Sequence, residues 1–381
     1  MTTKEKRSPL DDARELAPTI RSSADEIEKN RELPRPLFEA LAAAGFFQLL
    51  IPRSVGGAEI DLPTYVQVLE ALGKADASTG WLVNQCAVFA TYAAQMPRDI
   101  ARSIWIDTPH SVVANTSMAT AEVVVVPGGY RVSGRQGFSS GCRHAAWLAA
   151  RGLVQENGQP EERFLFVPAA EAEIVDTWNV RGMRGTGTHH FVVKDVFVPV
   201  ERTVLQAGAP FLESGPLYQF SRRLLFATGD AAVALGTASA CLEAFAELAG
   251  VKKPRLMQAT LRDQPAIQAT FGHSEAQLRA SRAFLIESVR DIWSEAAPSG
   301  AISAGRRAVL RLATTHAIRM AVDVVDSVYN ACGVTSIFEG NSIQRYFQDI
   351  HVISQHAQAS LANYELIGKH LLGLKVDPGR F

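Results

Sequence analysis

Residues 121–134, AEVVVVPGGYRVSG, contain two β-rich runs joined by the turn Pro127–Gly129, and they mark a change in the character of the chain. Further short runs rich in Val, Phe and Tyr follow, and this stretch ends near Val204. Such runs, separated by Gly and Pro, are typical of antiparallel strands. The sequence therefore predicts a compact antiparallel β-domain in the middle of the chain. The later runs are WLAARGLV, RFLFVPA and HHFVVKDVFVPV.

Helical patterns flank this β segment on both sides. From Ala13 to about Trp105 apolar residues recur every three or four positions, interrupted by the loop IPRSVGGAEIDLP at residues 51–63. Beyond the β segment the pattern predicts four long helices, whose lengths suit an up-and-down bundle. These are Phe220–Gly250, Gly272–Ala297, Ser303–Val334 and Ile343–Leu372.

The length of 381 residues suggests two or three domains, and 47% hydrophobic residues are typical of a globular protein. We expect an α+β protein with three parts. They are an N-terminal helical domain (residues 1–108), a middle antiparallel β-domain (109–215) and a C-terminal four-helix bundle (216–381).

Charge and cysteine usage limit the partners and the compartment. Lys and Arg number 38 against 39 Asp and Glu, so the chain lacks the basic surface that nucleic acid or an anionic membrane requires. Small molecules or other proteins are the expected partners. The four cysteines are far apart, and the charged N-terminus lacks a signal-peptide core, which favours a reducing cytoplasm.

Several local patterns exclude other classes of protein. The charge-free run between Asp76 and Arg98 is long enough to span a bilayer, but its polar amides indicate a buried helix. GMRGTGT at residues 182–188 lies between β-like runs and does not open a helix, so it is not a dinucleotide fingerprint. His351 and His356 lie about 140° apart around a helix, and we expect no metal site.

Four separated stretches together resemble the acyl-CoA dehydrogenase superfamily of flavoproteins over nearly the whole chain. The resemblance implies the superfamily fold, with a flavin between the β-domain and the bundle, and a homotetramer whose neighbouring subunit helps to close the site. The stretches are LFEALAAAGFFQLLIPRSVGGAEIDL (37–62), GGYRVSGRQGFSSG (128–141), WNVRGMRGTGTHHFVVKDVFVPVE (178–201) and QRYFQDIHVISQHA (344–357).

A dehydrogenase of this superfamily needs a carboxylate base to remove the proton α to a thioester carbonyl. The sequence FEG around Glu339 imitates the catalytic Glu-Gly of that family. Aligning the helix on Arg345 and Asp349 instead places Ala357 at the position of the base. An alternative base position, just ahead of a pattern similar to RLLFATG, holds Arg222. Both usual carboxylates are therefore expected to be absent.

The chain more closely resembles a second branch, the oxygenase components of two-component flavin monooxygenases that hydroxylate aromatic compounds. The similarity lies in FSSG (138–141), in W-x-x-x-G-M-R-G-T-G-T from Trp178, and in QRYFQDIHVISQH. It implies that reduced FMN or FAD (FMNH2 or FADH2) reacts with O2 to give a C4a-hydroperoxide. This intermediate must be shielded from water and stabilised by hydrogen bonds. An acyl-CoA dehydrogenase or oxidase with a non-standard base, and a non-catalytic descendant, are the alternatives.

The same resemblance suggests two catalytic residues. Ser139 lies where family members direct a hydroxyl toward flavin N5 and C4a, so we expect it to stabilise the hydroperoxide. His356 replaces the neighbourhood of the dehydrogenase base and could donate to the peroxide or transfer its proton. The structural alternatives are a serine in a β-turn and a histidine that serves only the fold.

Cofactor contacts are expected from the β-domain and the bundle. Trp178 would pack at the flavin edge and Asn115 at its polar edge, while Arg262 resembles a flavin-phosphate ligand. The alternatives are a core tryptophan, a glycine turn around residues 184–188, and a solvated arginine. The full expected set is Asn115, Phe138, Ser139, Ser140, Trp178, Arg184, Thr186, Thr188 and Arg262.

The substrate pocket is expected to contain Trp81, Phe89 and His356. Some phenol hydroxylases of this branch carry a histidine where Phe89 stands, and phenylalanine cannot accept a phenolic proton. A less polar small aromatic substrate, such as an indole, is therefore favoured unless Phe89 is plain helix core. Since no nicotinamide domain is recognisable, we expect a separate NAD(P)H:flavin reductase to deliver reduced flavin by diffusion.

Overall fold

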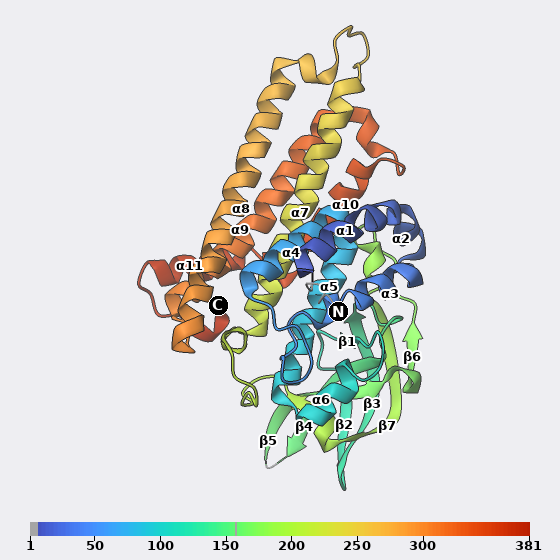
Figure 1. Cartoon of the computed structure of the whole chain (residues 1–381), viewed down its shortest axis with the longest axis vertical. Helices are drawn as coiled ribbons and strands as arrows, with labels where there is room; N and C mark the ends of the chain where they lie inside the picture. The colour runs from blue at the N-terminus through green and yellow to red at the C-terminus, as the bar shows by residue number, and fades with distance from the viewer. Residues whose placement is uncertain (1–6, 157) are drawn as a thin grey trace, which may run out of the picture.

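The computed structural model describes residues 7–156 and 158–381, and their elements follow the predicted order of helices, strands and helices (Figure 1). Ser8, Asp61 and Asp76 begin three of the first helices, and the side chain of each accepts a hydrogen bond from a backbone N–H of the first turn. The helix after Asp76 is buried along nearly its whole length, as predicted. The N-terminal helices are α1 Pro9–Ser22, α2 Ala24–Asn30, α3 Arg35–Ala43, α4 Leu62–Ala75, α5 Ala77–Phe89 and α6 Arg98–Trp105.

The middle part contains two four-stranded sheets, ordered β1-β4-β5-β8 and β2-β3-β7-β6. Apolar side chains from β3 and β7 of one sheet and from β4 and β5 of the other form a common core. All pairings of named strands are antiparallel except β1–β4, so the predicted antiparallel β-domain has one parallel pair, at the edge of a sheet. The strands are β1 Val113–Asn115, β2 Glu122–Val126, β3 Gly129–Ser139, β4 Trp147–Glu156, β5 Gln159–Pro168, β6 Ala172–Val175, β7 His189–Pro199 and β8 Thr203–Leu205.

The C-terminal part differs from the prediction in two places. The second helix begins at Pro265 rather than Gly272, since proline fits the first turn of a helix. The predicted fourth helix is broken, because His356 has an extended backbone and starts a short 3-10 turn, Ala357–Ala359. The helices are α7 Arg222–Val251, α8 Pro265–Ser299, α9 Ala304–Cys332, α10 Ser342–Ser354 and α11 Ala362–Leu371.

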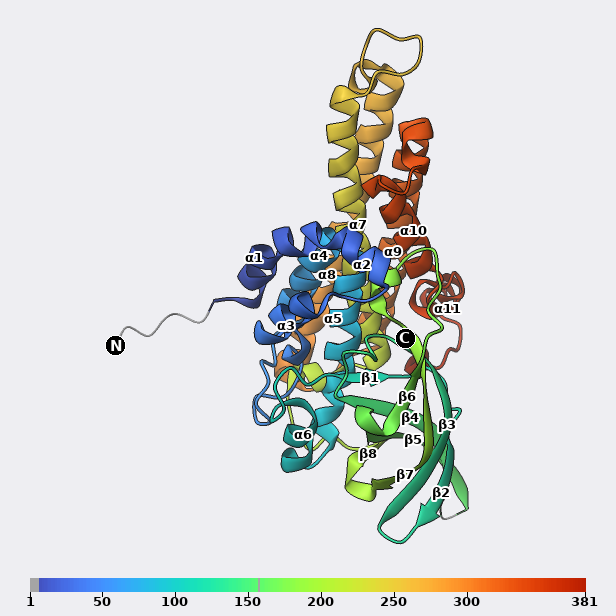
Figure 2. The ribbon, with the colours of Figure 1, turned by 90° about the vertical axis from the view of Figure 1, so that its right-hand side faces the viewer.

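Helix α7 forms the centre of the molecule and packs against α4, α5, α9 and α10. By length and composition α7 could cross a membrane, but 89% of its most apolar window is buried inside the fold. The β-domain lies at one end of the molecule and the α7–α8 connection at the other, with the N-terminal helices against the middle (Figures 1 and 2). The three parts therefore meet beside α5 and the end of α10.

Candidate active site

A cavity of about 290 Å³ lies where the three parts of the chain meet. It is close to the lower end of the range of about 300–1,000 Å³ that ligand pockets usually occupy. None of the described residues that line it is an aspartate or glutamate. The lining residues are Trp81, Gln85, Asn115, Ser117, Phe138, Ser140, Trp178, Met183, Thr186, Thr188, Val352, Ile353, Gln355 and His356.

One wall of the cavity is the loop between β6 and β7, which contributes Trp178, Met183 and two threonines. The indole Nε1 of Trp178 donates to the Met183 carbonyl at 3.0 Å, and the Met183 N–H donates to Asp349 Oδ1 of α10 at 2.5 Å. Burial, with Asp76 as a second cause, raises the pKa of Asp349 to about 8. A Cβ on Gly182 would lie 2.2 Å from the Gln348 carbonyl oxygen, so glycine lets this loop contact α10.

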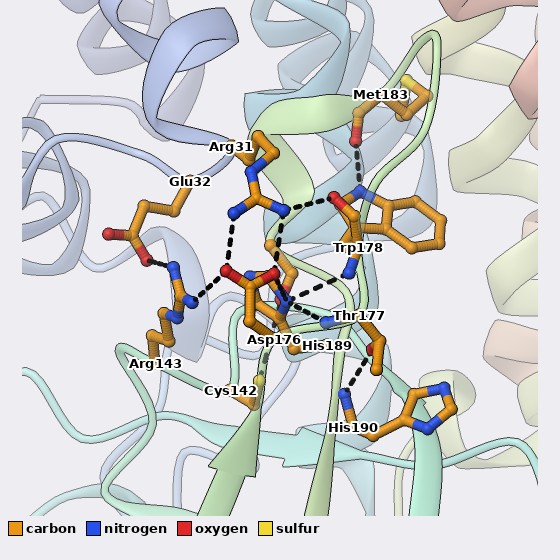
Figure 3. Close-up of polar contacts among 11 residues, drawn as sticks. Arg31, Glu32, Cys142, Arg143, Asp176, Thr177, Trp178, Met183, His189 and His190 are labelled. Atoms are coloured by element: carbon orange, nitrogen blue, oxygen red, sulfur yellow. Dashed lines mark hydrogen bonds and ion pairs between the residues drawn. The ribbon is translucent and has the colours of Figure 1, made fainter.

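An ionic cluster anchors the start of this loop to the N-terminal helices (Figure 3). Arg31 donates to both oxygens of Asp176, at 2.8 and 2.6 Å, and to the Trp178 carbonyl at 3.2 Å. The hydrogen bond from Arg31 is the main cause that lowers the pKa of Asp176 to about 2. The Nδ1 of His189 accepts the backbone N–H groups of Thr177 and Trp178, each at 3.2 Å. Trp178 is thus fixed at the cavity from three directions.

Three hydroxyls form a chain along the same wall. Ser140 Oγ lies 2.9 Å from Thr188 Oγ1, which lies 2.7 Å from Thr186 Oγ1, and Thr186 donates to the Met183 carbonyl at 2.8 Å. Each hydroxyl has one hydrogen, and a carbonyl can only accept. Thr188 must therefore donate to Thr186, and Ser140 to Thr188. Ser140 then has no hydrogen left for the cavity, where its oxygen can only accept hydrogen bonds.

Of the two adjacent serines predicted to bind the cofactor, Ser140 lines the cavity and Ser139 does not. Between Gln136 and Ser139 strand β3 has one more residue than its partner β7, and Phe138 has a positive φ of 59°. This bulge changes the alternation of the side chains. Phe138 and Ser140 line the cavity, whereas Ser139 is fully buried, pairs with His189 and has no hydrogen-bond partner among the described residues.

His356 is the one residue titrating near neutrality among the described cavity residues. Its ring lies 5.2 Å from the ring of Trp81 in an edge-on arrangement. On the other side its Nδ1 lies 3.2 Å from Oδ2 of Asp230, a fully buried residue of α7. Together with Asn115 and the Ser140 and Thr188 hydroxyls, these positions bring most of the predicted site residues to one cavity.

Besides Ser139, two predicted cofactor ligands do not line the cavity. The Arg184 side chain points to α2, where Nε donates to the Glu28 carbonyl at 3.0 Å, and Nη1 donates to the Val180 carbonyl at 2.9 Å. Arg262 is exposed in the α7–α8 connection, at the end of the molecule opposite the β-domain (Figure 1). Within one chain Arg262 therefore cannot contact a ligand in this cavity.

Phe89, which was predicted to lie in the substrate pocket, does not line the cavity. Phe89 is the last residue of α5, is 1% exposed and packs against Tyr92, Phe164 and Phe166. The cavity ends one turn earlier, at Gln85. There α5 passes onto the sheet, and aromatic side chains fill the space.

We expect Phe89→Ala to lower the free energy of unfolding by about 3–5 kcal/mol, because truncation leaves a cavity among three aromatic rings. Chemical denaturation of the flavin-free protein measures this loss. Phe197→Ala, at a position 43% exposed on β7, serves as the control and should cost less than about 1 kcal/mol. A Phe89→Ala variant as stable as that control would contradict the assignment to the core.

The positions considered for a dehydrogenase base hold no usable carboxylate. Arg222 donates to Thr91 Oγ1 at 2.9 Å and to Gln95 Oε1 at 2.7 Å, and burial lowers its pKa to about 10. Ala357 lies in the 3-10 turn after α10. Glu339 is exposed before the start of α10, and Val352, the first residue of that helix at the cavity, lies ten residues, about 15 Å, beyond Ser342.

Sequence reasoning missed Gln85, Met183 and Asp230. Gln85 had a signal, because it lies one helical turn after Trp81 and thus on the same face of α5. Met183 belongs to a stretch already noted for its glycines, but only the folded loop shows its carbonyl as the acceptor of two side-chain hydrogen bonds. Asp230 directly follows RLLFATG, yet nothing in the sequence indicates that it meets His356.

Comparison with known proteins identifies the family. Family models described as "Acyl-CoA dehydrogenase, N-terminal domain" and "Acyl-CoA dehydrogenase, C-terminal domain" match residues 3–98 and 228–361. An indole-3-acetate monooxygenase from Pseudomonas putida is 30% identical over 365 residues, which cover 94% of this chain and 92% of the relative. The oxygenase subunit HsaA, a flavin-dependent monooxygenase from Mycobacterium tuberculosis, is 31% identical over 370 residues, covering 94% of each chain.

The crystal structure of the HsaA monooxygenase from M. tuberculosis is similar along its whole length. It superimposes with a TM-score of 0.88 at 30% identity, and the match covers 98% of this chain and 100% of that chain. The α+β architecture predicted from the sequence is confirmed. The chain belongs to the acyl-CoA dehydrogenase superfamily and, within it, to the flavin-dependent monooxygenases.

Proposed function

We propose that this chain is the oxygenase component of a two-component monooxygenase, which uses reduced FMN or FAD and O2 to hydroxylate a small aromatic or heteroaromatic molecule. The observation that supports this most strongly is the cavity itself. Aromatic and apolar side chains form its faces, hydroxyls line one edge, and no described lining residue is a carboxylate. A dehydrogenase needs such a base, whereas an oxygenase needs a shielded, hydrogen-bonding site.

The residues present fit a flavin ring system. Trp178 and Met183 supply an apolar wall, and Asn115 and Thr188 supply polar contacts at an edge. Ser140 offers a hydrogen-bond acceptor, which suits the N5–H donor of a reduced flavin. A bound reduced flavin supplies the two electrons that activate O2.

The protein's own part is to orient, shield and move a proton. Trp81 and Trp178 cover the cavity with aromatic surface and exclude water. Ser140 orients the ring through its lone pair. We propose that His356 accepts a proton from the substrate through the ring nitrogen that does not face Asp230.

The substrate side of the cavity is formed by α5 and the end of α10. Trp81, Val352 and Ile353 provide an apolar surface for an aromatic ring. The Gln85 Nε2 is buried there without a partner among the described residues, which suits a substrate that carries an oxygen acceptor. Because Phe89 does not line the cavity, it gives no reason to favour an indole-like substrate. The proposal of such a substrate is instead based on the name of the P. putida relative, an indole-3-acetate monooxygenase.

We further propose three features of the working system. A separate NAD(P)H:flavin reductase supplies the reduced flavin, as the name "oxygenase subunit" implies for HsaA. The protein acts as a homotetramer, an assembly in which Arg262 could contact a flavin bound by another copy of the chain. The compartment is the cytoplasm, in keeping with four free, buried cysteines.

Reconstitution tests the proposed reaction. The purified chain is combined under air with a flavin reductase, NADH, FMN or FAD, and a panel of phenols and indoles, and products are analysed by mass spectrometry. We expect a product heavier by one oxygen atom for at least one class of aromatic substrate. The same product at the same rate without this chain would refute the assignment.

Glu339→Gln should leave this hydroxylation within about twofold of the original rate, because the carboxylate lies at the far end of α10. The parallel assay adds acyl-CoA thioesters anaerobically to the protein with oxidised flavin and follows the flavin absorbance. Bleaching by an acyl-CoA that disappears in the Glu339→Gln variant would establish a dehydrogenase instead.

A further inference from the structure

Asp230 and His356 form a buried contact behind the cavity. Asp230 is 0% exposed, and its Oδ2 lies 3.2 Å from His356 Nδ1. Neither atom has a hydrogen-bond partner among the described residues, so the contact is an ion pair when the ring is protonated. The imidazole itself reaches the cavity, and 39% of its side chain remains accessible. One ring nitrogen is therefore directed to a buried carboxylate, and the other is left for the cavity.

The orientation of Asp230 is set by residues from two other helices. Asn84 of α5 donates from Nδ2 to Asp230 Oδ1 at 2.9 Å and to the Phe226 carbonyl at 3.1 Å. Tyr65 of α4 donates to Asn84 Oδ1 at 2.8 Å. A Cβ on Gly229 would lie 2.0 Å from Asn84 Oδ1, so only glycine leaves room for this amide. With Oδ1 occupied, Asp230 has only Oδ2 to offer, and it faces His356.

We propose that Asp230 is the positioning residue of His356: it holds the Nδ1-protonated tautomer and leaves Nε2 as the proton acceptor toward the cavity. The assignment deepens the proposed function, because the proton that Nε2 takes would come from the aromatic substrate. A buried carboxylate that fixes a histidine tautomer in this way is a recurrent device for making imidazole an efficient base.

The charges around His356 act in opposite directions. Burial lowers the pKa of His356, and Arg311 of α9 lowers it as well, but the contact with Asp230 outweighs both and raises it above its ordinary value. Of the neighbouring titratable groups, Arg223 lowers the pKa of Arg311, and Asp230, after burial, raises the pKa of Tyr65. Removing the Asp230 charge leaves only influences that lower the pKa.

The chain contains a matched control on the preceding helix. His351 Nε2 lies 2.9 Å from Asp326 Oδ1, but both side chains are more than a third exposed and neither lines the cavity. Exposed pairs of this kind contribute little. Asp326→Asn therefore removes a carboxylate beside a histidine without touching the proposed site.

The test uses the flavin-free protein with 15N-labelled histidine, whose NMR signals report the tautomer and the pKa of each ring. His356→Gln identifies the His356 signals. In the unchanged protein we expect Nδ1–H in the neutral ring and a pKa above about 6.5. Asp230→Asn should bring the pKa below about 6.5, and Asp326→Asn should leave both His356 properties unchanged. An Nε2–H tautomer in the unchanged protein, or an unaltered His356 in a folded Asp230→Asn protein, would overturn the proposal.

The NMR result is independent of catalysis, so it separates the two proposals. If no aromatic substrate is hydroxylated but the tautomer is Nδ1–H, the function fails and the assignment of Asp230 stands. In the active enzyme Asp230→Asn should shift the low-pH limb of the product-formation rate to lower pH, because the neutral ring persists there. A limb that does not move would contradict the role of Asp230.

Discussion

Ser140→Ala is expected to reduce the share of consumed O2 that appears in hydroxylated product about tenfold to a hundredfold, with H2O2 as the remainder. That range corresponds to the loss of one well-placed hydrogen bond, about 1.5–3 kcal/mol. Ser140 ends the hydroxyl chain that runs through Thr188 and Thr186 to the Met183 carbonyl. Its oxygen is therefore a hydrogen-bond acceptor at the cavity. The measurement is product and H2O2 quantified together at a known consumption of reduced flavin.

Ser139→Ala is the natural comparison, because it removes a neighbouring hydroxyl that lies outside the cavity lining. We expect a smaller loss of coupling for this variant than for Ser140→Ala. The loss of coupling for Thr186→Val should fall between these two. The substitution keeps the shape of the side chain, but without the Thr186 hydroxyl the hydrogen-bond direction along the chain to Ser140 is no longer fixed. The reverse order, with Ser139→Ala the most uncoupled, would return the role to Ser139.

His356→Gln is expected to lower the rate of product formation about 10²- to 10⁴-fold, the usual contribution of a general base, while reduced flavin still binds. The rate in the unchanged enzyme should rise with pH as His356 loses its proton, since only the neutral ring accepts one. Because the pKa of His356 is raised, this increase in rate should occur at a higher pH than it would for a histidine with an ordinary pKa. Single-turnover assays across pH measure both effects.

The corresponding change at the neighbouring pair, His351→Gln, provides the control and should leave product formation within about twofold. If His356→Gln forms product at the original rate, the histidine does not act as the base. A loss of reduced-flavin binding in place of a loss of product would instead assign His356 to cofactor capture.

Much of the fold could be predicted from the sequence because its signals are local. Pro127–Gly129 between two β-rich runs specifies a hairpin, and Asp61 and Asp76 mark helix starts by the type of their side chains. The general location of the site followed from the resemblance, which brought Trp178 and His356 together. These features depend on neighbours in the sequence or on long shared stretches.

The errors arose where a single residue alters the geometry or where distant segments meet. The extra residue near Phe138 exchanges the directions of Ser139 and Ser140, and alternation along a strand cannot reveal it. Phe89 was assigned to the pocket by alignment with phenol hydroxylases, but the cavity ends at Gln85, a limit that depends on how α5 packs against the sheet. The contact between Asp230 and His356 joins positions 126 residues apart, and no local sequence pattern indicates a contact over that separation.

Stopped-flow mixing of the protein and reduced flavin with O2 tests the central claim most directly, since it needs no knowledge of the substrate. The account predicts that reduced flavin binds, and that its reaction with O2 passes through a transient whose absorbance differs from that of reduced and of oxidised flavin. Ser140→Ala should shorten the lifetime of this transient. Direct conversion of reduced to oxidised flavin at the rate of free flavin, with no transient in the unchanged protein, would contradict the assignment as an oxygenase.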